Sequence, residues 1–154
     1  MALVDRLPGT WRGDGEGHYP TMATFGFREE LTFTRLGDNP VIAYAQRPWH
    51  PDDGRPLHVE CGDLRCDGER VELVLAQPTG FIEIHHGRAA DGAIAFGLTA
   101  FARSMSALPV QTLRRRWQLD GDDRLACDLW MTYGGVVDGH HLRSLLRRTP
   151  LQDA

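Results

Sequence analysis

The sequence contains no lysine, because all 17 of its basic residues are arginine. A chain without lysine has neither the amine of a Schiff base nor the lysine of a phosphate-binding P-loop, so both chemistries are excluded. Cysteine is also scarce. The three cysteines, Cys61, Cys66 and Cys127, are an odd number, which does not suggest a secreted fold held by disulfides. A reducing compartment is the simplest interpretation.

Long apolar runs are missing as well, and none approaches the roughly 20 residues that cross a bilayer. The first residues, Met1–Pro8, include Asp5 and few apolar side chains, unlike a signal peptide. A formal net charge of -4 gives no general attraction to nucleic acid or to a membrane surface. We therefore expect a cytoplasmic protein, one domain over residues 1–154, monomeric or homodimeric, with neither nucleic acid nor membrane as partner.

Glycine-containing turn signals divide most of the chain into short segments that are apolar or alternate between apolar and polar residues. Regular spacing of such segments is typical of an all-β sandwich or barrel. The breaks are too short for helical crossovers, so neighbouring strands should be antiparallel. The predicted strands are Glu30–Leu36, Val41–Trp49, Leu57–Arg65, Val71–Ala76, Phe81–His86, Ile94–Phe101, Thr112–Leu119 and Leu125–Tyr133.

The last segment, Gly139–Arg148, departs from this pattern. Its leucines, Leu142, Leu145 and Leu146, fall at helical spacing, and Pro150 follows as a terminating residue. The sequence therefore predicts a closed or nearly closed up-and-down barrel with a short C-terminal helix. A barrel of eight or more strands can leave room for one small ligand, and such barrels are usually carriers or pocket proteins.

The most distinctive motif is GTWRGDGEGHYPT, from Gly9 to Thr21. Glycines at alternate positions from Gly13 to Gly17 strip one face of a first strand of its side chains. This permits strong curvature, or the close approach of another backbone or of a flat ligand. Trp11 would then plug one end of the barrel. Barrel closure alone explains the glycines equally well.

These residues resemble nitrobindins, whose signature G-x-W-x-G-x-G is reproduced by Gly9–Gly15. The resemblance implies a ten-stranded antiparallel barrel, like lipocalins and fatty-acid-binding proteins, that holds ferric heme b on one axial histidine. It also implies isomerisation of peroxynitrite to nitrate and binding of nitric oxide. The likeness extends over Tyr19–Thr21, Phe25–Leu31, Pro40–Gln46, Pro56–Gly62, Ala76–Gly80, Glu83 and His141-Leu142.

The resemblance selects His141 as the axial and catalytic residue. The family ligand lies ten residues after a methionine of the last strand, and Met131 precedes His141 by that interval. The predicted helix makes the same choice, because His141 lies at the edge of the leucine stripe and His140 points nearly opposite. A histidine is also the commonest proximal ligand of heme iron. Without the family, a polar first turn of the helix explains both histidines.

The resemblance further implies a set of residues that contact the cofactor. His58 matches a histidine of the pocket wall, although a half-exposed strand position explains it equally well. Leu57 stands where relatives have Met or Leu, and Thr21 matches a position in contact with heme. The implied cofactor-binding residues are Thr21, Leu57, His58, Gln77, Met131 and His141, with His141 the only metal ligand.

Two other clusters of polar residues have structural interpretations. His85 and His86 adjoin Gly87 and are expected in a solvated turn. On a strand, Arg114 and Arg116 are expected on one face and Arg115 on the other. This pattern favours an outer barrel face over a nucleic-acid patch, because the net charge is negative.

A second class of function stays open, a heme-free barrel that carries a small hydrophobic ligand as lipocalins do. The pocket would discriminate between the two classes. An axial histidine favours heme, whereas a buried arginine–tyrosine pair favours the carboxylate of a fatty acid. The match at His141 favours heme b, with peroxynitrite and nitric oxide as small-molecule ligands.

Overall fold

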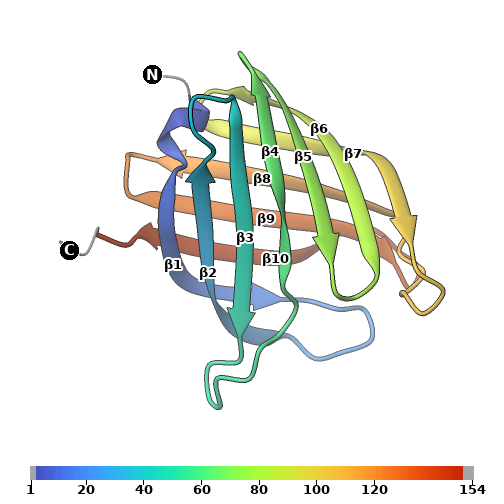
Figure 1. Cartoon of the computed structure of the whole chain (residues 1–154). Helices are drawn as coiled ribbons and strands as arrows, with labels where there is room; N and C mark the ends of the chain where they lie inside the picture. The colour runs from blue at the N-terminus through green and yellow to red at the C-terminus, as the bar shows by residue number, and fades with distance from the viewer. Residues whose placement is uncertain (1–2, 151–154) are drawn as a thin grey trace.

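A computed structural model describes residues 3–150, and Figure 1 shows that they form a closed barrel of antiparallel strands. Every strand pairs with its neighbours in the chain, and β1 pairs with β10 to close the ring. The all-β up-and-down prediction is therefore confirmed. After a 3-10 helix, η1 (Leu3–Arg6), come β1 (Gly9–Gly17), β2 (Phe25–Arg35), β3 (Val41–Trp49), β4 (Glu60–Asp67), β5 (Arg70–Gln77), β6 (Phe81–Ala90), β7 (Ala93–Arg103), β8 (Thr112–Asp120), β9 (Arg124–Tyr133) and β10 (Val136–Arg148).

Strands β2 to β9 correspond to the eight predicted segments, with one misplaced turn. Gly87 continues β6, where it pairs with both β5 and β7. The chain turns instead at Asp91 and Gly92, whose φ angles are 52° and 76°. The predicted solvated turn at His85 and His86 is therefore wrong. No helix among residues 3–150 has the length and apolar character of a membrane span.

The predicted C-terminal helix is also wrong, because Gly139–Arg148 belongs to the final strand, β10. An inward position of this strand is polar, since buried Ser144 donates a hydrogen bond to Glu29. An outward position is apolar, since Leu145 is 61% exposed. These two residues interrupt the alternation of apolar and polar side chains that is typical of a strand, and they leave the leucines at helical spacing. As a strand, the segment also pairs with β1, whose backbone would otherwise lie at an open edge.

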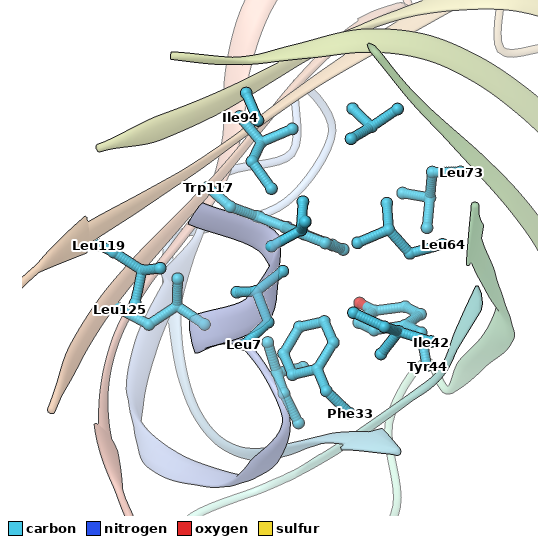
Figure 2. Close-up of a cluster of buried hydrophobic side chains, with 14 of the residues drawn as sticks. Leu7, Phe33, Ile42, Tyr44, Leu64, Leu73, Ile94, Trp117, Leu119 and Leu125 are labelled. Carbon is cyan, nitrogen blue, oxygen red and sulfur yellow. The ribbon is translucent and has the colours of Figure 1, made fainter. Parts of the chain in front are cut away.

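One end of the barrel is filled by a large apolar core that η1 covers. Figure 2 shows Leu7, Phe33, Trp117 and other side chains of this core converging beside the helix. Trp11 is fully buried, and its indole nitrogen donates a hydrogen bond to the Leu7 carbonyl over 2.8 Å. The buried members are Val4, Leu7, Trp11, Leu31, Phe33, Ile42, Tyr44, Leu64, Val71, Leu73, Leu75, Ala89, Ile94, Phe96, Trp117, Leu119, Leu125 and Leu146.

The glycines of β1 serve packing between strands and aromatic rings. A Cβ on Gly13 would lie 2.0 Å from the Leu145 carbonyl oxygen of β10. A Cβ on Gly15 would lie 2.2 Å from the ring of Phe27. The first strand therefore lets β10 approach closely at one glycine and lets an aromatic side chain lie across another.

Candidate functional site

The opposite half of the barrel contains a cavity of about 340 Å³. Its walls are mostly apolar or aromatic, and a few polar side chains reach it, which is typical of small-molecule sites. The lining residues are Tyr19, Met22, Phe25, Phe27, Gln46, Pro48, His50, Arg55, Leu57, His58, Gln77, Phe81, Val110, Leu113, Leu129, Met131, His141 and Leu142.

His141 reaches this cavity because β10 contains a bulge. His140 pairs with Trp130 and Leu142 pairs with Leu129, so His141 has no partner on β9. An extra residue re-aims the side chains on either side of it. His141 consequently faces inward at 7% exposure. His140 lies outside, stacked on the Trp130 ring with centroids 5.0 Å apart.

The protonation state of His141 is set by the start of the β1–β2 connection. Its Nδ1 lies 2.7 Å from the His18 carbonyl oxygen, and a carbonyl only accepts hydrogen bonds, so Nδ1 carries the proton. Burial lowers the pKa of His141, partly opposed by this hydrogen bond. The neutral ring therefore has its lone pair on Nε2, which forms no hydrogen bond within residues 3–150. Metal-binding histidines commonly have this arrangement, in which one ring nitrogen donates to a carbonyl and the other is free to bind the metal.

Five of the six residues expected to bind a cofactor line the cavity, while the sixth, Thr21, is exposed in the loop after β1 and is not part of the lining. His58 lies just before β4 rather than on a strand, and its ring is exposed to the open cavity. Partial desolvation by the cavity walls lowers its pKa, so it is neutral at pH 7. The five lining residues are Leu57, His58, Gln77, Met131 and His141.

The sequence motifs do not single out the aromatic side chains of the walls. The Tyr19 ring meets His141 edge-on, with centroids 4.3 Å apart, and it limits the rotation of the imidazole. Phe81 stacks on Phe101 at 5.2 Å and packs with Met131. The signal for these residues was present, because they occupy inward positions of strands or adjoin the glycine motif.

A charged layer separates the cavity from the closed core. It consists of the buried side chains of Glu29, Glu60, Glu83, His85 and Arg115. Arg115 donates to both oxygens of Glu60, at 2.7 and 3.0 Å, and to Glu83 at 3.0 Å. His85 contacts the same Glu83 at 2.7 Å.

Hydrogen bonds extend this layer across the barrel. Gln77 joins Glu60 to Glu83 by donating to both. Gln46 and Ser144 donate to Glu29, and the Tyr44 hydroxyl lies 2.8 Å from Glu60. Gln46 and Gln77 reach the cavity, whereas the charged groups lie behind them.

The predicted alternation of Arg114–Arg116 is confirmed, because Arg114 and Arg116 are exposed on the outer face and Arg115 points inward. His85 on β6 also points inward. The sequence carried a signal for Arg115, which stands two positions from a large apolar residue on either side, in Leu113-x-Arg115-x-Trp117. On a strand, such spacing places all three side chains on one face.

The donor set fits a heme and does not fit a bare metal ion. Within residues 3–150, no three His, Cys, Asp or Glu side chains come together as a metal site. His141 instead offers one neutral nitrogen at an apolar, aromatic cavity. One imidazole at an apolar pocket is a usual way to hold heme iron, because the porphyrin supplies the equatorial ligands.

Comparison with known proteins identifies this class. Residues 1–148 match the family described as "THAP4-like, heme-binding beta-barrel domain". The chain therefore belongs to this family of heme-binding barrels, which confirms the resemblance to nitrobindins.

The relatives narrow the class further. "Peroxynitrite isomerase 1" of Rhodococcus jostii (strain RHA1) is 45% identical over 141 residues, covering 91% of this chain and 79% of that protein. "Peroxynitrite isomerase" of Nocardia farcinica (strain IFM 10152) is 41% identical over 153 residues, covering 96% and 90%. The crystal structure of Rv2717c from M. tuberculosis superimposes with a TM-score of 0.87 at 35% identity, covering 96% and 95%.

Proposed function

We propose that this protein binds heme b through His141 and isomerises peroxynitrite to nitrate. The observation that carries the proposal is the neutral His141 ring, held by the His18 carbonyl with its free nitrogen at an apolar cavity. The family and the names of the relatives support the same assignment.

The cavity residues would orient the cofactor and limit access of water. The His18 carbonyl and the edge of Tyr19 fix the plane of the His141 ring. Phe81 supplies a flat aromatic surface and Met131 a flexible apolar one for contact with a porphyrin face. These contacts favour a large planar ligand over a small polar one.

When bound, ferric heme would supply a Lewis-acidic iron that polarises the O–O bond of peroxynitrite. Substrate and product have the same atoms and the same charge, so the chain need not donate a proton overall. His58 lies on the cavity wall and offers a hydrogen bond to a polar ligand, whereas the amide nitrogen of Gln77 already donates to Glu60 and Glu83. We also propose that nitric oxide binds at this site, and that residues 1–154 act as one cytoplasmic domain, monomeric or homodimeric.

The experiment that tests heme binding is a hemin titration of the His141→Ala variant. We expect the Soret absorption of the wild-type complex to be lost or strongly shifted, with hemin affinity at least tenfold weaker. Far-UV circular dichroism should still report a folded barrel, because His141 lies at the cavity rather than in the closed core.

The matched control is His140→Ala, which removes the neighbouring histidine from the outer face. It should bind hemin as the wild type does. An unchanged Soret band and affinity in His141→Ala would refute the ligand assignment. Peroxynitrite decay and nitrate yield, measured on the hemin-loaded proteins, test the activity separately.

A further inference from the structure

The interior contains a buried arginine beside a tyrosine, the kind of pair that would receive a ligand carboxylate. Arg115 lies in the charged layer behind the cavity. The nearby Tyr44 hydroxyl donates a hydrogen bond to Glu60, which also binds Arg115. Arginine is well suited to carboxylates, because two parallel N–H groups match two oxygens. The question is whether this arginine is available to a ligand.

The chain's own glutamates already occupy it. Glu60 takes both terminal nitrogens of Arg115, at 2.7 and 3.0 Å, and Glu83 lies 3.0 Å from one of them. Within residues 3–150, Nε is the one guanidinium nitrogen of Arg115 that has no hydrogen-bond partner. An incoming carboxylate would therefore have no pair of parallel donors to bind.

The charges of the layer oppose a third carboxylate as well. Burial would raise the pKa of Glu83, but Arg115 and His85 lower it to about 2. The same two glutamates raise the pKa of Arg115 against the effect of its burial. One arginine thus faces two glutamates, and a third carboxylate would add a like charge where water is excluded and repulsion is strong.

The mouth of the cavity has the opposite character. Arg55 and His50 belong to its lining, and exposed Arg55 forms an ion pair with Asp53. A ligand carboxylate at the mouth would find an exposed cation and remain hydrated.

We propose that Glu60 and Glu83 are specificity determinants: by occupying Arg115 they bar an inward-pointing carboxylate, so that the cavity admits an anionic amphiphile only with its apolar end first. A fatty acid therefore cannot bind in this barrel with its carboxylate pointing inward. Under the proposed function, the propionates of heme would stay at the mouth. The exclusion itself does not require heme.

The experiment uses dodecanoate labelled with ¹³C at the carboxyl carbon and the heme-free wild-type protein at pH 7.5. A water-soluble paramagnetic agent broadens the carboxyl signal of any head that faces solvent. We expect the wild type to give either no bound dodecanoate or a bound carboxyl signal that is broadened. A bound carboxyl signal protected from broadening would overturn the proposal, whatever the variants do.

Glu60→Gln frees Arg115 while keeping the shape of the side chain. We expect this variant to bind dodecanoate at least tenfold more tightly than the wild type, with a protected carboxyl signal. Glu83→Gln is the second variant, should the first fail to fold. The control is Glu30→Gln, which alters an outer pair with Arg12 and should behave as the wild type.

A folded Glu60→Gln or Glu83→Gln protein that binds dodecanoate no better than the wild type would also overturn the proposal. Hemin titrations of the same proteins keep the two hypotheses apart. Failure of the wild type to bind hemin would contradict the proposed function and leave the dodecanoate result to decide the exclusion.

Discussion

The two halves of this barrel have the same strands but opposite interiors. Around η1 the interior is filled by large apolar side chains such as Trp11, Leu7 and Phe33, which are almost inaccessible to solvent. Beyond the charged layer the interior is open, and side chains such as Met131 and His141 face a cavity. One half provides stability, and the other provides a binding surface.

Because one half is filled and the other is open, the same kind of mutation should affect stability differently in each. A side chain deleted from a filled interior leaves a new void, with lost contacts on every side. A side chain deleted from a cavity wall only enlarges a space that already exists. The charged layer lies at the boundary, so its residues should respond to pH rather than to volume. Substitutions in each half and in the charged layer test this division.

Trp11→Ala should have the largest effect. It removes a fully buried indole and its hydrogen bond to Leu7, so the free energy of unfolding should fall by about 3–5 kcal/mol. Urea denaturation followed by circular dichroism measures the loss. A loss below about 1 kcal/mol would mean that the closed half is not the main source of stability.

Glu83→Gln should lower stability by about 3 kcal/mol at pH 7, with a loss that depends on pH. The pKa of Glu83 is about 2 in the folded protein and near 4.5 when unfolded. Its ionised form therefore stabilises the fold above pH 4.5, and this contribution is lost as the pH falls toward 2. Urea denaturation of both proteins at pH 7 and pH 3 should show their difference shrinking at the lower pH.

Met131→Ala should separate the two halves most directly. Met131 belongs to the cavity wall, so its removal creates no closed void and should lower the free energy of unfolding by only about 1–2 kcal/mol. Hemin affinity should fall in the same variant, because the wall loses its contact with the porphyrin. A stability loss as large as that of Trp11→Ala, with hemin affinity unchanged, would abolish the distinction.

Glu29→Gln should have the smallest effect, a gain in stability of about 0.5–1 kcal/mol at pH 7. Burial raises the pKa of Glu29, although Ser144 and Gln46 partly oppose this by hydrogen bonding. A raised pKa means that the stabilising contribution is present at low pH and lost as the pH rises through the folded value. The variant has no such loss, so thermal melts at pH 7 and pH 4 should show its advantage only at the higher pH.

Much of the barrel could be predicted from the sequence, because its strands alternate and its turns contain glycine. β3 matches its predicted bounds, Val41–Trp49. β10 was missed because Ser144 and Leu145 reverse the expected polarity of their faces. The polar partner of Ser144 is Glu29, on a strand more than a hundred residues away. No local pattern reveals such a contact.

The candidate site was predictable to a similar extent. The interval from Met131 selected His141 by resemblance, and the structure places its ring at the cavity. The helical geometry that also selected His141 was wrong, since a bulge in β10 turns it inward. His85 was assigned to a solvated turn, and Arg115, although placed opposite Arg114 and Arg116, was not recognised as buried, because charged residues usually are solvated. Their burial depends on Glu60 and Glu83, which only the closed barrel brings to them.

The bond between His18 and His141 has a consequence for the order of folding. The two residues are 123 positions apart in the sequence, and they meet only where the first strand joins the last. Pairing between chain ends carries the largest loop-closure entropy in an up-and-down barrel, so it should form late. A partly folded chain has the imidazole but not the carbonyl that aims it. Cofactor loading should accordingly follow ring closure, and hemin should select the finished barrel over its folding intermediates.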